Sequence, residues 1–200
     1  TCTIMDQDGT VYARTFISFS KEHDRLNTQL GRIKRNQKRG SRHNKKLWRS
    51  VSGISQDIAD KTVKAILDFG NEHGVDVFVL EYLDFKGKNI VKRAHFWRYK
   101  RIYKVLAQRA HQYGLRIARV NARYTSRLAF DGSGWSKRGR EITPDAPYAE
   151  MQFPTGKFYN ADLNASYNIG ARYFIRHLLK TVTVTQRLAL EAKAVSYTHL

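Results

Sequence analysis

The chain has 200 residues, 42% of them hydrophobic and 12% aromatic, which is enough to bury a core in one domain or in one domain with an insertion. It has no run of about 18 apolar residues that could cross a membrane, and its first residues lack the apolar core of a secretory signal. The single cysteine, Cys2, excludes an internal disulfide framework and a cysteine-based zinc site. We therefore expect a cytoplasmic protein that does not engage a membrane.

The charge of the chain is strongly positive. Thirty-six Lys and Arg face 17 Asp and Glu, so the net charge is +19 and the pI is about 10.2. Such a charge disfavours self-association and favours a polyanionic partner. The sequence shows no strongly amphipathic terminal helix that would bind an anionic membrane surface. Nucleic acid is therefore the expected partner.

The first 50 residues predict a hairpin followed by basic helices. Thr1 to Met5 and Thr10 to Ile17 are β-prone and flank the turn dipeptide Asp8-Gly9. A helix is expected from Ser20, and about residues 21–50 read as two helical arms joined near Gly40. Such a basic run is often only a solvated surface, but we interpret this one as an arm that contacts phosphates. Its expected contact residues are Arg32, Lys34, Arg35, Lys38, Arg39, Arg42, Lys45, Lys46 and Arg49.

The middle of the chain repeats a pattern of helix, glycine and strand. An apolar stripe predicts a helix at about 56–72, Gly74 ends it, and "VDVFVLE" follows as a strand of the kind buried in a parallel sheet. A second helix from about residue 99 ends at Gly114, and the strand "LRIARV" follows. This repeat is typical of an α/β fold in which helices connect neighbouring strands.

The last third of the chain opens with an irregular segment. Residues 123–156 are rich in glycine and proline, and they predict either an ordered insertion or a mobile loop. A short strand at 157–160 and a helix at about 162–180 follow. The tail, 181–200, could form a strand and a short helix, although "VSYTHL" fits no pattern.

Two carboxylates occupy positions that suit catalysis. Glu81 ends the apolar strand, where ligands of α/β sheets gather, and Asp162 lies in the first turn of the later helix. Each also has a simpler explanation: Glu81 as a rim carboxylate paired with Lys or Arg, and Asp162 as an ordinary helix cap. Together they suit a nuclease in which carboxylates hold two divalent ions about 4 Å apart. Carboxylate oxygens favour Mg²⁺ or Mn²⁺.

Two motifs resemble a known family. "VFVLEYLDFKGK" resembles the second RuvC motif, and "YNADLNASYNIGARY" the third, of the transposon-encoded TnpB (OrfB) proteins and the related type V CRISPR effectors. "VNARYTSRLAFDGSG" stands where that family begins a zinc ribbon. The resemblance spans about Thr1 to Lys180.

The resemblance implies a fold and a division of the chain. The expected fold is α/β: a ribonuclease-H-like (RuvC) mixed sheet with flanking helices, a basic helical arm and a degenerate insertion at the zinc-ribbon position. Residues 1–122 would form the RuvC-like core without its first strand, and 123–156 an insertion without the ribbon cysteines. Residues 157–180 would be the final RuvC segment and 181–200 a tail.

The resemblance also implies a function. The chain would be the RuvC nuclease part of an RNA-guided DNA endonuclease, with Glu81 and Asp162 as catalytic metal ligands for Mg²⁺ or Mn²⁺ and with no zinc. Its partners would be target DNA and guide RNA, in the cytoplasm at the bacterial nucleoid. The family's first catalytic Asp would precede Thr1, and Asp6 and Asp8 beside the hairpin turn are poor substitutes. We therefore expect a fragment that does not cut efficiently by itself.

Other residues carry weaker expectations. Arg123, Thr125 and Ser126 could line the path of a nucleic-acid strand. Asn164 and Asn168 could orient Asp162 or touch substrate, or could be polar residues on a helix surface. A mixture of basic and aromatic residues at 86–101 suits nucleic-acid binding, with Lys92, Arg93 and Arg98 as expected contacts. Two alternatives remain: a catalytically inactive DNA- or RNA-binding module of the same descent, and an unrelated basic RNA-binding protein in which both acids are structural.

Overall fold

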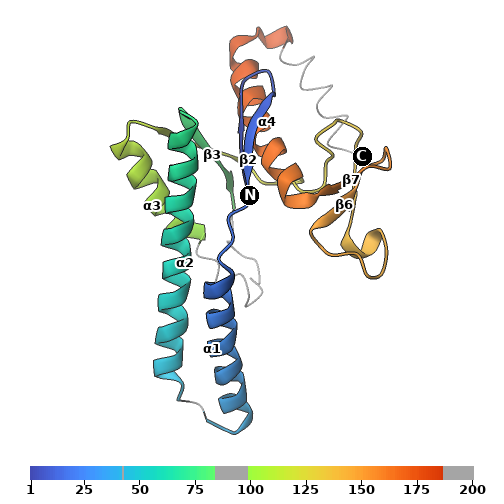
Figure 1. The fold of residues 1–200 in the computed structure, drawn as a ribbon. Coiled ribbons are helices and arrows are strands. Elements are labelled where there is room, and N and C mark those ends of the chain that lie inside the picture. Colours follow the sequence, from blue (N-terminus) through green and yellow to red (C-terminus); the bar gives the residue numbers. More distant parts are fainter. Residues whose placement is uncertain (42, 84–98, 187–200) are drawn as a thin grey trace. The chain divides into compact units, whose positions relative to one another are not determined.

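The computed structural model describes residues 1–41, 43–83 and 99–186 (Figure 1). The chain forms two compact units that interleave along the sequence. The first unit comprises Thr1–Phe16, Val77–Leu83 and Ile117–Leu200, and the second comprises Ile17–Asp76 and Asp84–Arg116. Each unit is described separately below.

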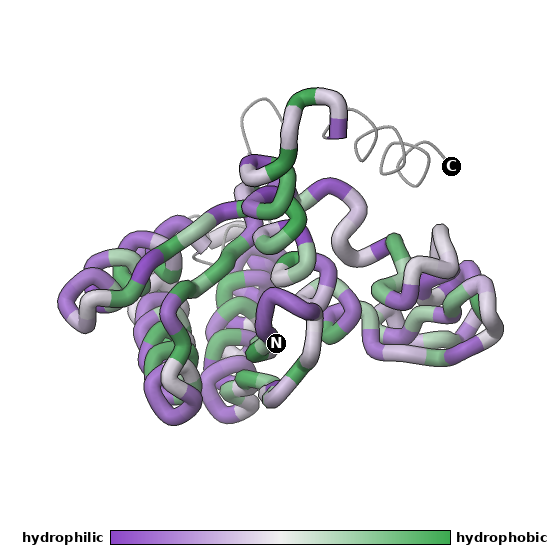
Figure 2. The backbone as a smooth tube through the Cα atoms, turned by 90° about the horizontal axis from the view of Figure 1, so that it is seen from above, coloured by the Kyte–Doolittle hydropathy of each residue, from purple (hydrophilic) through white to green (hydrophobic). Residues whose placement is uncertain are grey.

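The second unit is built on a pair of long helices, α1 (Ser20–Lys38) and α2 (Lys45–Glu72). Leu26 and Ile33 of α1 are buried against Val51 and Ile54 of α2. Figure 2 shows hydrophilic and hydrophobic residues alternating along these coils, as expected of helices that bury one side. The structure thus confirms the two predicted helical arms.

The turn between α1 and α2 is held by two asparagines. Gly40 has a φ of 83°, a conformation that L-residues with a side chain rarely adopt. Asn36 Nδ2 donates to Asn44 Oδ1 at 2.8 Å, and Asn44 is buried. The second predicted arm and the helix predicted at about 56–72 form one continuous helix, because Val51 and Ile54, which lie between them, are buried against α1.

The third helix of this unit, α3 (Tyr99–Gln112), packs on α2. Arg101 makes two hydrogen bonds to the Asp60 carboxylate, through Nε at 2.9 Å and Nη2 at 2.7 Å. The buried apolar residues in the C-terminal half of α2 and in α3 are Ala59, Val63, Leu67, Ile102, Leu106 and Ala110. This arrangement confirms the predicted apolar stripes.

The first unit begins with an antiparallel hairpin of β1 (Cys2–Met5) and β2 (Val11–Thr15). Asp6 closes its turn: Oδ1 accepts the N–H groups of Asp8 at 3.0 Å and Thr10 at 2.9 Å. Its other oxygen, Oδ2, accepts the hydroxyl of Tyr12 at 2.6 Å. Asp6 therefore has a structural role in the turn.

A second pair of strands, β3 (Val77–Tyr82) and β4 (Arg116–Asn121), carries the apolar runs of the sequence. Gly74 and Gly114, which precede these strands, have φ values of 63° and 71°, as expected where a helix ends in a left-handed residue. The predicted burial of β3 is not observed, since residues 77–81 are only half-buried. Within the described residues the sheet has only these two strands. A two-stranded sheet leaves more of each strand exposed to solvent than a larger sheet does.

Helix α4 (Ala161–Thr181) packs on both β1 and β3. The hairpin contacts the helix at Gly170, where an added Cβ atom would lie 2.3 Å from the Met5 sulfur. Glycine at this position therefore lets the hairpin lie directly on the helix.

Residues 123–156, for which the sequence allowed either order or mobility, are ordered; we call them the insertion, after the role that the family resemblance assigns to them. They contain β5 (Lys137–Arg138), the short helix η1 (Gly139–Glu141) and β6 (Glu150–Gln152). With β7 (Phe158–Asn160), the strands form an antiparallel sheet in the order β5-β6-β7. Met151 and Phe153 are fully or almost fully buried beneath it.

Four rings, which we name the aromatic cluster (Phe130, Phe153, Tyr159 and Tyr167), join the insertion to α4. The Phe130 ring centroid lies 5.5, 5.1 and 4.9 Å from those of Phe153, Tyr159 and Tyr167. Burial and, next, the hydrogen bond to Tyr167 raise the pKa of Tyr159 to about 12. Ring packing thus stabilises a segment that the family resemblance assigns to a zinc ribbon.

Among the described residues, no helix is both long enough and apolar enough to cross a membrane.

Candidate active site

Asp162 lies in the first turn of α4 but does not cap the helix. The cap is Asn160, whose side-chain oxygen accepts the N–H groups of Asp162 and Leu163, both at 3.0 Å. The alternative in which Asp162 is only a helix cap is therefore wrong. Its side chain is 64% exposed, so the carboxylate remains accessible to solvent.

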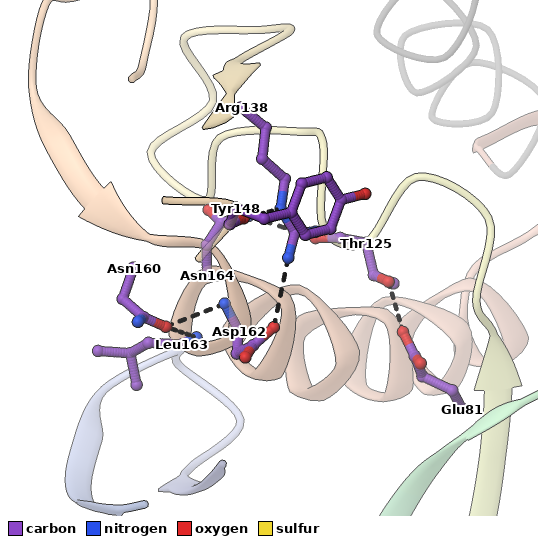
Figure 3. A network of polar contacts seen from close by, with 8 residues as sticks. All are labelled: Glu81, Thr125, Arg138, Tyr148, Asn160, Asp162, Leu163 and Asn164. Carbon is purple, nitrogen blue, oxygen red and sulfur yellow. Dashed lines mark hydrogen bonds and ion pairs between the residues drawn. The ribbon is translucent and has the colours of Figure 1, made fainter. Parts of the chain in front are cut away.

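An arginine from the insertion lies beside Asp162. Arg138 places Nη2 3.6 Å from Asp162 Oδ1, as Figure 3 shows. The same guanidinium donates through Nε to the backbone oxygen of Tyr148 at 2.7 Å and lies over the Tyr148 ring, 4.1 Å from its centroid. These contacts leave the Arg138 side chain only 11% exposed and fix its position next to the carboxylate.

Glu81 lies near the end of β3 and contacts a different residue from the segment after β4. Thr125 Oγ1 donates to Glu81 Oε1 at 2.5 Å, and the backbone oxygen of Ala122 lies 3.1 Å from the same hydroxyl oxygen. Burial lowers the pKa of Arg172 on α4, and the nearby Glu81 carboxylate partly offsets that effect. In Figure 3 the Glu81 carboxylate is turned to Thr125 and the Asp162 carboxylate to Arg138.

A row of polar side chains on α4 binds the backbone of β4 and of the turn that follows it. Asn164, Asn168, Arg172 and Arg176 are spaced four residues apart, so they share one side of the helix. We call them the polar row. The two arginines donate to the backbone oxygens of Asn121 and Arg119, at 2.6 and 3.1 Å.

The two asparagines of the polar row bind the turn that carries Thr125. Asn164 Nδ2 donates to the backbone oxygens of Leu128 at 2.8 Å and Thr125 at 3.3 Å, while its Oδ1 accepts the N–H of Phe130 at 2.9 Å. Asn168 Nδ2 donates to the same two oxygens, at 2.7 and 2.8 Å. Asn164 is completely buried. None of these bonds goes to Asp162, so the predicted role of orienting that carboxylate is not observed, and the burial of Asn164 excludes a helix-surface residue at that position; the group that the two asparagines position is the Thr125 turn.

The insertion is further tied by an ion pair. Arg127 donates to Glu141 through both terminal nitrogens, and the Arg138 N–H donates to Glu141 Oε2 at 3.0 Å. Arg127, the larger cause, and the Arg138 N–H together lower the pKa of Glu141 to about 2. Because Arg138 belongs to β5, this pair helps to fix the arginine that reaches Asp162.

The donor chemistry of Glu81 and Asp162 fits a hard divalent cation, since both supply carboxylate oxygens. Across the described ranges 1–41, 43–83 and 99–186, no group of three or more His, Cys, Asp or Glu side chains is arranged to hold a metal ion. The predicted sharing of an ion by these two carboxylates therefore stays a prediction.

The predicted nucleic-acid contacts fall in both units. Those of the basic arm gather at the α1–α2 turn and are all exposed: Arg32, Lys34, Arg35, Lys38, Arg39, Lys45, Lys46 and Arg49. In the first unit, Arg123 is exposed and Ser126 is half-buried, on either side of the buried Thr125. Arg42, Lys92, Arg93 and Arg98 lie outside the described residues. Binding by all of them stays a prediction.

Sequence reasoning missed three residues around the two carboxylates: Arg138, Tyr148 and Arg172. The spacing of the polar row was visible in the sequence and could have indicated Arg172. The other two come from irregular segments, where no periodicity shows which side chains reach Asp162.

Comparisons with known proteins add a relationship. No family model matches the chain. A TnpB-like protein of Aquifex aeolicus (strain VF5) is 27% identical over 146 residues, which cover 68% of this chain and 46% of that protein. The chain thus spans about half the length of this curated relative.

Two solved structures share the fold. A Cas12f1–sgRNA–target DNA complex matches with a TM-score of 0.60 at 18% identity, over 80% of this chain and 45% of that one. C2c1 of Alicyclobacillus acidoterrestris, solved with single-guide RNA, matches with a TM-score of 0.56 at 18% identity, over 82% of this chain and 21% of that one. In sequence the chain is thus similar to a TnpB-like protein, and in fold it is similar to parts of the solved Cas12f1 and C2c1 structures.

Proposed function

We propose that this chain is the RuvC-type nuclease part of an RNA-guided DNA endonuclease, which hydrolyses phosphodiesters by a two-metal mechanism. The nuclease core would comprise residues 1–122 and 157–180, with 123–156 as an insertion between them. Target DNA and guide RNA are the proposed partners. The observation that carries the proposal is that one segment, residues 123–138, supplies polar partners to both Glu81 and Asp162.

Glu81 and Asp162 would hold Mg²⁺ or Mn²⁺, which when bound supplies Lewis acidity and an activated water. The chain's own residues would position these ligands. Thr125 orients the Glu81 carboxylate through its hydroxyl, and the asparagines of the polar row fix the turn that carries Thr125. Arg138 gives Asp162 a positively charged neighbour.

For the chain by itself we propose weak cutting. The family resemblance assigns a further carboxylate to a strand before Thr1, and the described residues bring no third acid to Glu81 and Asp162. The proposed function is therefore best tested with the gene extended upstream and with its bound RNA recovered.

The experiment compares cutting of guide-matched DNA in millimolar Mg²⁺ by the extended protein and by two variants, Glu81→Gln and Asp162→Asn. Both variants should lose cutting, because an amide removes the negative charge that a divalent ion requires. Asp145→Asn is the matched control, since Asp145 is an exposed carboxylate of the insertion, which contains neither Glu81 nor Asp162. Melting temperature with and without Mn²⁺ supplies a second readout, and the unmodified protein should gain more than either variant.

Undiminished cutting by Glu81→Gln would show that Glu81 is wrongly assigned as a metal ligand. Loss of cutting in Asp145→Asn as well would show that the assay reports folding rather than chemistry.

One observation favours a second function, a catalytically inactive module that binds DNA or RNA. Eight exposed basic residues at the α1–α2 turn form a cationic surface that needs no catalysis to bind phosphates. In that case, the extended protein would retain RNA through purification, and neither Mn²⁺ nor Glu81→Gln would change its melting temperature.

A further inference from the structure

The insertion holds one tyrosine ring in an unusual setting. Tyr148 is 75% exposed, yet Arg138 lies over its ring and bonds to its backbone oxygen. A planar guanidinium behind one face of a ring fixes the ring and leaves the other face available for stacking. Figure 3 shows this ring beside Asp162, linked to it through Arg138.

A second exposed ring in the insertion is backed in the same way. Trp135 is 43% exposed, and the Arg127 guanidinium lies 5.6 Å from its ring centroid. The Tyr124 ring meets it edge-on with centroids 5.1 Å apart. Glu141 joins the two arginines, because its carboxylate accepts both terminal nitrogens of Arg127 and the backbone N–H of Arg138. The two arginine-backed rings are thus connected through one carboxylate of the insertion.

The backbone at both rings is specialised. Gly139 has a φ of 57°, and a Cβ atom there would lie 3.2 Å from Tyr148 Cα, so only glycine lets the Tyr148 segment pack this closely. Tyr124 has a φ of 64°, and it is the only non-glycine residue with a positive φ among the described residues. Backbone strain at a bulky residue is uncommon and concentrates at functional sites. Because the Tyr124 ring contacts the Trp135 ring, the strained residue belongs to the same surface.

We propose that Tyr148 and Trp135 form a stacking surface for unpaired bases of single-stranded nucleic acid. The partner follows from the chemistry: aromatic rings stack on bases of any sequence, and the insertion also carries two exposed basic residues, Lys137 and Arg140, that can attract phosphates. A duplex keeps its bases inside and cannot use the rings. The stacking of bases on these rings does not depend on the proposed function. Only the further step, that a nucleic-acid strand bound here leads to a cutting site, rests on the proposed function of Asp162.

The test measures binding of the 200-residue chain to labelled oligothymidine, to an abasic strand of the same length and to a duplex, at one fixed salt concentration. The abasic strand keeps every phosphate and lacks every base, so it isolates the electrostatic contribution. The unmodified chain should bind oligothymidine more tightly than the abasic strand. Tyr148→Ala and Trp135→Ala should each weaken oligothymidine binding about tenfold and leave abasic binding unchanged. Oligouridine in the same assay distinguishes RNA from DNA as the preferred strand.

Two controls keep the result specific. Tyr148→Phe retains the ring and should bind like the unmodified chain, while Tyr113→Ala removes a comparably exposed tyrosine, 63% exposed, from the other unit and should have no effect. Equal binding of both strands by the unmodified chain, absence of binding, or an equal loss on both strands in Tyr148→Ala would overturn the proposal.

The two proposals fail separately. Glu81→Gln should keep the preference for bases while the extended protein loses cutting. If Glu81→Gln still cuts, the assigned site is wrong and the stacking surface stands. If Tyr148→Ala binds normally, the stacking surface is wrong and the nuclease proposal stands.

Discussion

Asn164→Ala should be among the most destabilising single changes in the first unit. The substitution leaves the Phe130 N–H without its acceptor and removes one of the two donors to the backbone oxygens of Leu128 and Thr125. A buried donor without a partner costs about 1–3 kcal/mol, and the void left by the amide adds about 1 kcal/mol. The expected loss in free energy of unfolding is therefore about 2–4 kcal/mol.

Asn168→Ala should cost less, about 1 kcal/mol, because Asn164 still donates to both oxygens that Asn168 binds. In the double variant neither asparagine remains as a donor to these oxygens. The double variant should therefore lose more than the sum of the single losses, by about 1 kcal/mol.

The assay is urea unfolding followed by the fluorescence of Trp135, with Trp48 and Trp97 replaced by Phe so that only the first unit reports. With a denaturant dependence of about 2 kcal/mol per molar urea, Asn164→Ala should lower the midpoint by about 1–2 M. Ser166→Ala is the control, since its hydroxyl bonds only within α4, to Leu163 O at 2.7 Å. Equal effects of Asn164→Ala and Asn168→Ala, or strictly additive losses in the double variant, would refute the shared-acceptor reasoning.

Three further predictions concern packing, pH and charge. Gly170→Ala should lower the free energy of unfolding by about 1 kcal/mol, because its methyl group displaces the flexible Met5 side chain while the better helix propensity of alanine offsets part of that cost, and Met5→Ala in the same chain should recover the loss. Glu141 has a folded pKa of about 2, below its ordinary value of 4.5, so its contribution to stability is complete above pH 4.5 and disappears as the pH falls through about 2. Glu141→Gln should therefore reduce the change of the urea midpoint with pH over that window. An unchanged dependence of the midpoint on acid pH would contradict the assignment. Lys45, Lys46 and Arg49 lie at the start of α2. Replacing all three by alanine should reduce the slope of log affinity for nucleic acid against log salt concentration by about two to three. A loss of affinity that is equal at all salt concentrations would argue against phosphate contacts.

The regular elements could be predicted because their signals are local. The apolar stripe of α2, the β-prone run of β3 and the stop at Gly74 each depend on residues a few positions apart, and the structure contains all three. The second arm and the helix at about 56–72 were predicted as separate elements, although they form one helix, because the contact of Val51 and Ile54 with α1 depends on a distant segment.

The surroundings of the two carboxylates could not be predicted because they depend on contacts between distant segments. The bond from Thr125 to Glu81 joins residues 44 positions apart, and Arg138 reaches Asp162 from a two-residue strand. Sequence reasoning could place both acids at element ends but not the groups that meet them. It also took Asp162 as a possible helix cap, although Asn160, two residues earlier, provides the cap.

The aromatic cluster has a consequence for how this protein can change. A ribbon tied by four thiolates fails when one ligand is lost, to oxidation, to a chelator or to mutation. Rings that pack around Phe130 carry no such dependence, because each contributes part of the contact area and tolerates substitution by another ring. The insertion can therefore vary gradually, one side chain at a time, while the helix beneath it keeps its place.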